Sequence, residues 1–385
     1  MARRSADGLV QARAKLNRGE PVWALGFMTG TSLDGVDAAL IQTDGVKVWS
    51  FGPCLGASFD PKTRDLLQGA VSDARTWGFD GPEPQSFGPA AAAHARACAA
   101  IGAQLIADFG ATPDIIGLHG QTVLHRARIG DQPAKTRQIA DAGAIAGTLS
   151  CPVVYDFRTD DVVQGGEGAP LAPVYHRALL GDGRPETAVL NLGGVANLTF
   201  FGSSADQIIA FDCGPANGPI DEWVSGHDRG SFDVDGRFAA LGTAHEGLLA
   251  DWLDHPFFDA PPPKSLDRYD FSASLARGLS FEDGCATFVA FAARAIAQGL
   301  RFAPAPITQV IACGGGRRNP TLLAAIEKAA GVQITDADEL GWRGDFVEAE
   351  AFAFMAVRRL LERPISFPGT TGVPNPSVGG RIYGD

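Results

Sequence analysis

The chain has 385 residues, of which 45% are hydrophobic and 20% are charged. This length exceeds one ordinary core and suits two domains, and the composition is that of a folded globular protein rather than a disordered one. The net charge of −12 argues against nucleic acid or an anionic membrane as the main partner, although backbone N–H groups bind anionic ligands at any net charge.

Cysteine usage and the N-terminus indicate the compartment. Six cysteines are spread along the chain with no CxxC pair, which is typical of a reducing cytoplasm. No apolar run approaches the roughly 18 residues of a membrane helix, and residues 1–21 lack the apolar stretch of a secretory signal. We therefore expect a cytoplasmic protein without a membrane partner, whose residues 1–21 form a frayed or helical extension.

The first half of the chain alternates between strand-like and helix-like segments. Residues 22–45, with the turn TGTSLDG between two apolar runs, predict a β-hairpin. Residues 90–110 are rich in alanine and predict a helix, and residues 114–120 predict a short buried strand that ends in glycine. Residues 187–206 then repeat the hairpin pattern around the turn LGGVAN.

The second half continues the alternation. Residues 285–303 predict a helix, residues 307–316 predict a strand that runs into a glycine-rich turn, and residues 345–364 predict a helix that ends at Pro364. Helices that alternate with apolar strands indicate an α/β class. The repeated hairpin suggests two related domains that face each other across a cleft, although glycine hairpins are common.

The turn of the first hairpin has the composition of a phosphate-binding loop. Its glycines allow backbone N–H groups to approach phosphate oxygens, its hydroxyls add donors, and Asp34 or Asp37 could hold a water on Mg²⁺. The alternative is a tight turn whose polar side chains bond their own backbone, which is the commoner case. No glycine is followed by lysine anywhere in the chain, so a Walker A loop is absent. In the second hairpin, Gly193 and Gly194 occupy the corresponding turn.

Asp212 stands in the segment AFDCGPANGPIDEW, at the end of an apolar run and next to Gly214 and Pro215. A carboxylate at the end of a strand is where a general base is found in many α/β enzymes. A structural alternative is an aspartate that caps the following turn, and the segment alone favours that alternative.

Two further segments carry candidate ligand-binding side chains. In HGQT, His119 and Gln121 could bond a sugar hydroxyl, although an isolated histidine is more often structural. In YDFRTDD, Arg158 could bind a carboxylate or a phosphate, or could pair with its acidic neighbours on the surface.

The segment CGGG at 313–316 joins a predicted strand to a predicted helix. Three successive glycines, among them Gly314 and Gly315, would let a flat ring approach the backbone, as an adenine site requires. The segment DVDG at 233–236 predicts a turn, because its glycine comes one residue too early for a calcium loop.

Taken together and in this order, the motifs resemble those of the anhydro-N-acetylmuramic acid kinases, and the resemblance runs from about Trp23 to the end of the chain. The motifs that carry it are GFMTGTSLDGVDAAL, HGQT, DFR with GGEGAPLAPVYH, NLGGVANLT, FDCGPAN, CGGGRRN and VEAEAFAF.

The resemblance implies a fold and an activity. The fold would be that of the actin, Hsp70 and sugar-kinase superfamily, with two RNase H-like α/β domains and ATP in the cleft between them. The activity would be hydrolysis of the 1,6-anhydro bridge of 1,6-anhydro-N-acetylmuramic acid with phosphorylation of O6, in the recycling of peptidoglycan. ATP and Mg²⁺ would be required, and a homodimer would be expected.

The resemblance also places functional roles on residues of this chain. The catalytic aspartate falls on Asp212, and the glutamate that opens the last helix falls on Glu348, near the substrate and the metal. His119 and Arg158 join them as expected substrate-binding residues, while the metal ligands stay open. The expected ATP-binding residues are Gly30, Thr31, Ser32, Leu33, Asp34, Gly35, Val36 and Asp37, with Gly193, Gly194, Gly314 and Gly315.

Two positions depart from the pattern of this family. Glu167 stands where glutamine is more frequent, which adds a negative charge near the expected cleft, and PPKSLD at 262–267 replaces the more frequent PKSTGR. We expect neither departure to touch the ATP hairpin or Asp212.

The sequence leaves two alternative functions: another sugar or acyl kinase of the same superfamily, and a nucleotide switch or filament protein. The pattern from FDCGPAN to VEAEAF argues against the former, and nothing in the sequence indicates a separate peptide-binding domain. The expected boundaries are an extension at 1–21, a first domain at 22–155 with 365–385, and a second domain at 156–364.

Overall fold

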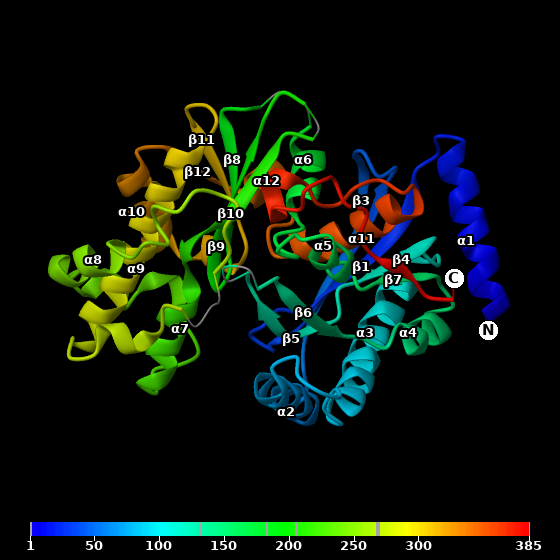
Figure 1. The fold of residues 1–385 in the computed structure, drawn as a ribbon, viewed down its shortest axis with the longest axis horizontal. Helices are drawn as coiled ribbons and strands as arrows, with labels where there is room; N and C mark the ends of the chain where they lie inside the picture. The colour runs from blue at the N-terminus through cyan, green and yellow to red at the C-terminus, as the bar shows by residue number, and fades with distance from the viewer. Residues whose placement is uncertain are drawn as a thin grey trace. The chain divides into compact units, whose positions relative to one another are not determined.

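The computed structural model describes residues 2–128, 130, 132–181, 184–204, 206–266 and 270–384. It divides the chain into two compact units (Figure 1). Unit 1 comprises Met1–Gly181 together with Phe346–Asp385, and unit 2 comprises Asp182–Asp345.

Unit 1 is built on a six-stranded sheet in the order β13-β7-β4-β1-β2-β3. The strands β1, β2 and β3 form an antiparallel meander, β4 and β7 add in parallel, and β13 closes the edge antiparallel to β7. A separate antiparallel pair, β5 and β6, follows β4. The strand bounds are β1 Val22–Met28, β2 Gly35–Thr43, β3 Val48–Ser58, β4 Ile115–Leu118, β5 Gln121–Arg126, β6 Lys135–Ile139, β7 Val153–Tyr155 and β13 Arg381–Ile382.

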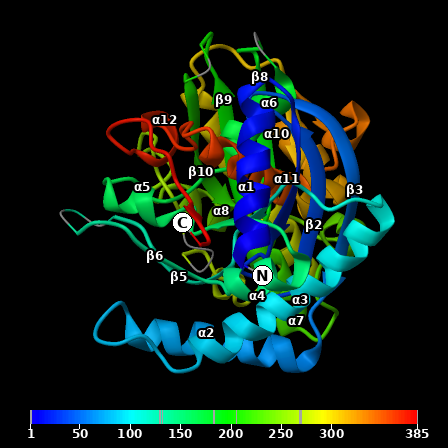
Figure 2. The same cartoon turned by 90° about the vertical axis from the view of Figure 1, so that its right-hand side faces the viewer.

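The helices of unit 1 pack around this sheet, and α2 and α3 lie side by side (Figures 1 and 2). The helix bounds are α1 Ala2–Asn17, α2 Pro61–Trp77, α3 Phe87–Phe109, α4 Ala142–Leu149, α5 Thr159–Val163, α6 Pro173–Leu180, α11 Val347–Leu360 and α12 Pro368–Thr371.

The helix α11 lies directly on the backbone of β1 and β4. A Cβ added at Gly26 would lie 1.8 Å from the carbonyl oxygen of Ala349, and one at Gly117 would lie 2.0 Å from that of Phe352. Both distances are far shorter than any carbon–oxygen contact, so only glycine permits this approach. Two glycines in the sheet therefore fix the position of α11 on it.

The helix α3 is long and apolar enough to cross a membrane by length and composition, with a mean hydropathy of 1.2 over an 18-residue window. The expectation that no segment approaches a membrane helix is therefore wrong on composition. Half of that window is buried inside the structure, where Ala90, Cys98 and Leu105 belong to the core of unit 1. The core helices of globular proteins meet the same test.

Unit 2 is built on a five-stranded sheet in the order β10-β9-β8-β11-β12. Its strands are β8 Thr187–Leu192, β9 Val195–Phe201, β10 Ile208–Pro215, β11 Gln309–Cys313 and β12 Gln333–Asp336. Its α-helices are α7 Asn217–Gly226, α8 Glu246–Leu253, α9 Phe281–Gly299 and α10 Pro320–Ala330. Its 3₁₀ helices are η1 Val234–Gly236, η2 Ala239–Leu241, η3 Ala273–Ala276, η4 Leu300–Phe302, η5 Gly315–Arg318 and η6 Ala337–Leu340.

The core of unit 2 is dominated by aromatic rings on and around α9. Phe258, Phe271 and Phe291 are buried and contact one another with ring centroids 5.2 to 5.7 Å apart. Pairs of this kind contribute roughly 0.5–1.5 kcal/mol each beyond the area they bury. They hold the segment before η3 against the helix.

The two sheets share one topology. In each, a three-stranded antiparallel meander is followed by two strands that add in parallel beside its first strand. This is the strand order of an RNase H-like unit, and its occurrence twice confirms the predicted α/β class of the actin-like ATPase fold. The predicted hairpins at 22–45 and 187–206 are β1–β2 and β8–β9, so the repeat is confirmed.

The boundaries of the units differ from those predicted. The chain changes unit at 181/182 and 345/346 rather than at 155/156 and 364/365. The physical reason is packing, because α6 and α11 contact each other and unit 1, and Tyr175 Oη donates a 2.6 Å hydrogen bond to the buried Glu350 carboxylate.

The N-terminal extension is a packed helix. Leu9, Ala12 and Leu16 on α1 are buried, and Lys15 Nζ lies 2.6 Å from Asp114 Oδ1. The other oxygen of this carboxylate accepts a 3.0 Å hydrogen bond from the backbone N–H of Trp23. Of the two expected forms, helical and frayed, the helical one is correct.

Candidate functional site

The base of the first hairpin tip, at the end of β1, is anchored by buried hydrogen bonds. Thr29 is buried, and its hydroxyl donates to the carbonyl of Gly120 at 2.9 Å while lying 3.2 Å from His94 Nε2. Gln121 Nε2 donates to the carbonyl of Gly30 at 3.1 Å. Burial lowers the pKa of His94 to about 4, so this anchor is neutral at physiological pH.

The tip itself presents polar side chains to solvent. Thr31, Ser32 and Asp34 are exposed, whereas Leu33 is buried and adopts a left-handed conformation with φ of 59°. The carbonyls of Leu33 and Asp34 accept hydrogen bonds from Arg64 Nε at 3.2 Å and from the backbone N–H of Phe59 at 3.0 Å. Since the carbonyls are bonded to the protein, the hydroxyls and the carboxylate are the exposed polar groups of the tip.

The two glycines of this tip differ in what they permit. A Cβ at Gly35 would lie 2.1 Å from the carbonyl oxygen of Ala57, so β2 and β3 approach too closely there for a side chain. A Cβ at Gly30 would meet nothing nearer than Ser32 Oγ at 3.4 Å, so this glycine leaves its backbone accessible. Of the two residues that complete the predicted ATP-binding stretch, Val36 is buried and Asp37 is half-buried.

His119 and Arg158, the predicted substrate-binding pair, are in direct contact. Arg158 Nε and Nη2 lie 3.2 and 3.1 Å from His119 Nε2, and Arg158 Nη1 donates to the carbonyl of Gly168 at 2.7 Å. Burial, followed by the charge of Arg158, lowers the pKa of His119 well below its usual value. His119 also lines a cavity of about 270 Å³ in unit 1, together with Tyr155 and other residues of its rim.

The helix α11 of unit 1 carries two glutamates that differ in exposure. Glu348 is half-buried in the first turn of α11, in the same unit as the first hairpin and His119. Glu350 is fully buried and accepts the hydrogen bond from Tyr175 described above.

The tip of the second hairpin is formed by glycine backbone, and its carbonyls accept hydrogen bonds from the first residues of α7. The backbone N–H groups of Ala216 and Gly218 donate to the carbonyl of Gly194, and that of Asn217 donates to Gly193, all at 3.0 Å. Asn217 Nδ2 adds bonds to the carbonyls of Leu192 at 3.1 Å and Gly193 at 2.9 Å. The glycine tip therefore caps α7, and Asn217 holds the two together.

Of the two predicted adenine-side glycines, Gly315 lies at the wall of a second cavity and Gly314 does not line it. Gly315 and Gly316 line a space of about 430 Å³ within unit 2, and Asn217 lines it as well. A Cβ at Gly315 would meet nothing within 4 Å, which leaves one face of this turn open. The other lining residues are Ile220, Asp221, Phe232, Asp233, Val234, Asp235, Arg318 and Asn319.

This cavity contains residues that sequence reasoning missed. The segment DVDG was predicted to be a turn, and it does form one, since η1 covers Val234–Gly236. It also contributes Asp233, Val234 and Asp235 to the cavity wall. No spacing in the sequence relates this segment to the glycines near residue 315, so only the fold brings them together.

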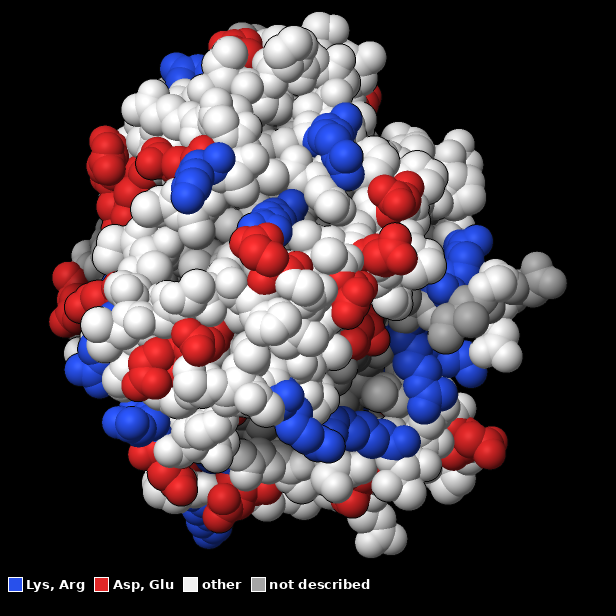
Figure 3. Space-filling view, turned by 90° about the vertical axis from the view of Figure 1, so that its left-hand side faces the viewer, with Lys and Arg blue, Asp and Glu red and all other residues white. Residues whose placement is uncertain are grey.

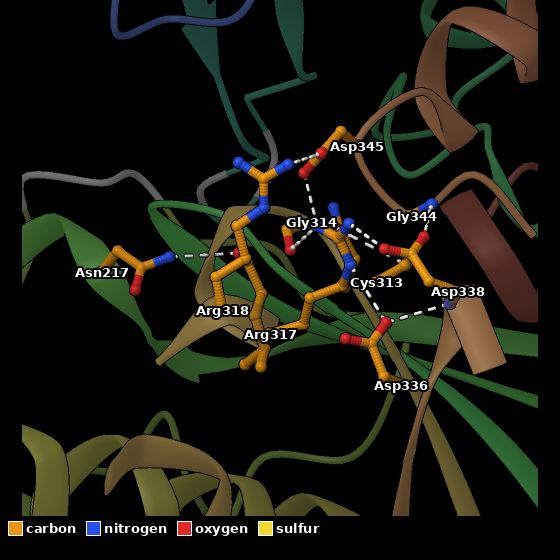
Figure 4. Close-up of polar contacts among 11 residues, drawn as sticks. Asn217, Cys313, Gly314, Arg317, Arg318, Asp336, Asp338, Gly344 and Asp345 are labelled. Carbon is orange, nitrogen blue, oxygen red and sulfur yellow. Dashed lines mark hydrogen bonds and ion pairs between the residues drawn. The ribbon is translucent and has the colours of Figure 1, made fainter. Parts of the chain in front are cut away.

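The buried side chain of Arg317 contacts the glycine turn at Gly314 and holds it in place (Figure 4). The Arg317 side chain is 2% exposed and contacts the carboxylates of Asp336, Asp338 and Asp345. It also donates to the carbonyl of Gly314 at 3.3 Å. Burial alone would lower the pKa of Arg317, but its bonds to Asp345 and Asp338 outweigh that effect and raise it.

Both carboxylate oxygens of Asp212 accept hydrogen bonds from the protein. Its Oδ1 accepts a 3.0 Å hydrogen bond from Asn197 Nδ2, and its Oδ2 accepts a 2.9 Å hydrogen bond from the backbone N–H of Leu266. Its own backbone N–H donates to the carbonyl of Lys264 at 3.1 Å. The ladder between β9 and β10 slips between Asp212 and Gly214, which is the kind of bulge that re-aims a side chain.

The two departures from the family pattern have different environments. The segment 262–266 contacts Asp212 directly, so the expectation that it would not touch the aspartate is wrong. Its contacts are made by backbone atoms of Lys264 and Leu266, which a comparison of side chains cannot reveal. Glu167 is paired in unit 1, where its carboxylate accepts from the backbone N–H of Arg128 at 2.9 Å.

The carboxylates and imidazoles do not form a ready-made metal cage. Among residues 2–128, 130, 132–181, 184–204, 206–266 and 270–384, no group of three or more His, Cys, Asp or Glu side chains could hold a metal ion. Mg²⁺ in kinases is typically held by substrate phosphates with one or two carboxylates. An exposed single carboxylate such as Asp34 fits that mode.

The face drawn in Figure 3 carries acidic and basic side chains in scattered groups between larger areas of other residues. The chain as a whole has a net charge of −12. A mixed surface of this kind favours solubility over non-specific binding to polyanions.

Comparison with known proteins identifies the family. The family model for "Anhydro-N-acetylmuramic acid kinase" matches residues 22–385. The anhydro-N-acetylmuramic acid kinase of Rhizobium rhizogenes is 49% identical over 374 residues, which covers 94% of this chain and 99% of the relative. That of Caulobacter vibrioides is 47% identical over 365 residues, covering 94% and 98%.

Similarity to solved structures is weaker. Component A of the (R)-2-hydroxyglutaryl-CoA dehydratase of Acidaminococcus fermentans is 12% identical with a TM-score of 0.44, covering 88% of this chain and 99% of the other. A TM-score this low supports no inference, so the fold assignment rests on strand order and on the family. On the match over residues 22–385, the chain belongs to the anhydro-N-acetylmuramic acid kinase family.

Proposed function

We propose that this chain opens the 1,6-anhydro ring of 1,6-anhydro-N-acetylmuramic acid with water and transfers the γ-phosphoryl group of ATP to O6. The products are N-acetylmuramate 6-phosphate and ADP. The family match over residues 22–385 carries this conclusion. The chain is thus a phosphotransferase with an alcohol group as acceptor, in amino-sugar metabolism and peptidoglycan recycling.

Each unit contributes a glycine-rich tip as a phosphate-binding element, and unit 2 adds its glycine turn as an adenine-binding element. The exposed hydroxyls of Thr31 and Ser32, with the open backbone of Gly30, bind phosphate oxygens. Gly193 and Gly194 serve the same purpose in unit 2. The adenine ring lies in the cavity of about 430 Å³ against Gly315 and Gly316, where the absence of side chains lets it approach the backbone, and Gly314 supports this turn from behind. Leu33, Gly35 and Val36 shape the first tip.

Mg²⁺ accompanies the nucleotide. It neutralises charge on the β- and γ-phosphates when it is bound. Asp34 is the exposed carboxylate of the first tip and Asp37 is its half-buried neighbour on β2, and one of them would hold the ion.

Asp212 is the general base. The substrate has no free O6 hydroxyl, because O6 is bonded to C1. Water attacks C1 and gives its proton to Asp212, the C1–O6 bond breaks, and O6 bonds to the γ-phosphorus as ADP leaves. The two hydrogen bonds on Asp212 favour its charged form, which is the form that accepts a proton from water. One carboxylate is enough, because O6 is captured by phosphorus and needs no carboxylic acid to protonate it.

Three residues of unit 1 bind the sugar. His119 and Arg158 contact each other and bind polar groups of the substrate, and Glu348 acts near the substrate and the metal. His119 Nε2 faces the Arg158 guanidinium, so the neutral imidazole carries its proton on Nδ1 and can donate it to a sugar oxygen. We place the enzyme in the cytoplasm, as a homodimer whose partners are small molecules.

An assay of ADP formation tests this proposal against its nearest alternatives. With ATP and Mg²⁺, the protein should release ADP only when 1,6-anhydro-N-acetylmuramic acid is added. Glucose and acetate, which test a hexose kinase and an acyl kinase, should give no more than background. ADP release that does not depend on the anhydro sugar would exclude the proposed function.

A further inference from the structure

The loop that bears on Asp212 is held by one lysine. Lys264 Nζ donates hydrogen bonds to the carbonyls of Phe257 at 2.7 Å and Phe258 at 3.2 Å. Its ammonium also lies 4.6 Å from the ring centroid of Phe257 and 4.8 Å from that of Phe302. The two carbonyls and the two aromatic rings together bind the Lys264 ammonium and so hold this residue of the loop in place.

The same residue is linked to the base through backbone atoms. The carbonyl of Lys264 accepts from the backbone N–H of Asp212, and the N–H of Leu266 donates to the Asp212 carboxylate. The ring of Phe211, which precedes the base on β10, lies 5.6 Å from Lys264 Nζ. The lysine is therefore bonded at its far end to the segment 257–258 and at its backbone to Asp212.

The geometry points to Lys264 as a positioning residue for the base: by fixing the loop 264–266 it keeps the Leu266 N–H on the Asp212 carboxylate. Lys264 does not itself touch substrate. The inference rests on the proposed role of Asp212 as general base. Residue 266 contacts Asp212 through its backbone N–H, which every residue type except proline possesses. The change from PKSTGR to PPKSLD therefore keeps the hydrogen bond to Asp212.

The other ionisable groups near this loop are few among the residues that the structure describes. Cys213 follows the base on β10, and burial raises the pKa of its thiol, which keeps it protonated. Asp259 is on the segment that Lys264 spans and contributes a charge to it. Burial lowers the pKa of Lys264, and the charge of Asp259 opposes that effect. Asn197, on the other side of the carboxylate, is neutral.

The variant Lys264→Met keeps the aliphatic stem and removes the ammonium. We expect kcat/KM for the anhydro sugar to fall about 10- to 100-fold, because small displacements of a catalytic group have effects of this size. The acidic limb of its pH profile should move up by about one pH unit, because a carboxylate that loses a donor is protonated more readily. KM for ATP should be unchanged.

A second variant and two controls separate positioning from loss of folding or of charge. Leu266→Pro removes the N–H that Asp212 uses and leaves every charge in place, so it should move the same limb in the same direction. Lys264→Arg should restore most of the activity. Lys328→Met makes the matched substitution at an exposed site on α10 and should keep the parent profile. A variant that is partly unfolded has a lower kcat/KM at every pH, but the acidic limb of its pH profile stays at the same pH.

The outcomes separate the inference from the proposed function. Unchanged pH profiles in both Lys264→Met and Leu266→Pro, with Asp212→Asn inactive, would overturn the positioning role and leave the base assignment intact. Substantial turnover by Asp212→Asn would instead overturn the base assignment on which the inference rests.

Discussion

The two hairpin tips have the same place in matching sheets but are built differently. In unit 1 the tip exposes hydroxyls and a carboxylate, on Thr31, Ser32 and Asp34, and its carbonyls are bonded to the protein. In unit 2 the tip is glycine backbone whose carbonyls cap α7 through Asn217. One topology thus supplies side-chain donors in one unit and a helix-bound backbone in the other.

The comparison extends to the residues behind the tips. Unit 1 fixes its tip with buried neutral groups, Thr29, His94 and Gln121. Unit 2 fixes its glycine turn with the Arg317 ion pairs and the Asp212 carboxylate with the loop around Lys264. The two units should therefore respond differently to substitution and to pH.

The largest effect is expected at Asp212. Asp212→Asn should lower turnover about 10³- to 10⁴-fold, because a general base contributes up to roughly that factor. Binding of ATP, measured by calorimetry, should be retained. Asp251→Asn, at an exposed position on α8, is the matched control and should leave both quantities unchanged. Loss of ATP binding in Asp212→Asn would show that the residue is misassigned.

At the tip of unit 1, function and stability should separate. Ser32→Ala removes an exposed hydroxyl and should raise KM for ATP or lower kcat about tenfold with no change in the melting temperature. Thr29→Ala removes a buried hydroxyl bonded to Gly120 and should lower the free energy of unfolding by about 1–3 kcal/mol. Equal melting temperatures for the two variants would contradict this division.

In unit 2, adjacent glycines should behave differently. Gly314 has φ of 79°, and a Cβ there would lie 2.4 Å from Asn191 Oδ1, so Gly314→Ala should destabilise unit 2 by about 2 kcal/mol or more. Gly315→Ala meets nothing within 4 Å and should fold normally while raising KM for ATP. Chemical denaturation and ATP titration measure the two effects, and a Gly315→Ala enzyme with unchanged KM would remove Gly315 from the nucleotide site.

How far the sequence predicts this molecule depends on the range of the interactions. The hairpins and the helices at 90–110 and 285–303 were predicted because turns and periodicity are local, and the structure places those helices at Phe87–Phe109 and Phe281–Gly299. The assignment of the last helix to the wrong unit shows the limit. Its place on β1 depends on Gly26 and Gly117, far away in the chain, and no local pattern marks that contact.

The candidate site shows the same limit. The polar turn at 30–37 and Asp212 stood out by composition, and the family resemblance gave them roles. The loop at 264–266 did not, because its bonds to Asp212 are made by backbone atoms that every residue type possesses. The contribution of residues 233–235 to the cavity beside Gly315 likewise depends on tertiary packing alone.

Acid should weaken unit 1 through its buried histidines. Burial lowers the pKa of His94 to about 4 and that of His176 to about 3. In the unfolded chain both histidines are protonated near pH 6.5, whereas in the folded unit they are protonated only at lower pH. Stability is therefore complete above about pH 6.5 and falls as the pH drops toward 4, by up to about 3 kcal/mol for His94. Urea unfolding at pH 7, 6 and 5 measures the fall, and His94→Gln should reduce it.

The smallest effect is expected at the N-terminus, which lies outside the family match at 22–385. Deleting residues 1–17 removes the buried side chains of Leu9 and Leu16 and the Lys15–Asp114 pair. The melting temperature should drop by a few degrees, because roughly 1–3 kcal/mol is lost. Activity at 25 °C should be retained, and its loss would assign α1 a role beyond packing.

The central claim is that water opens the ring at C1 while O6 accepts phosphate, and isotope position tests it most directly. The enzyme is incubated with ATP, Mg²⁺ and the anhydro sugar in ¹⁸O-labelled water, and the product is read by mass spectrometry at once, before C1 exchanges. The account predicts one ¹⁸O at C1, none in the phosphate, and one ADP per sugar. Label in the phosphate, or ADP formed without ring opening, would contradict it.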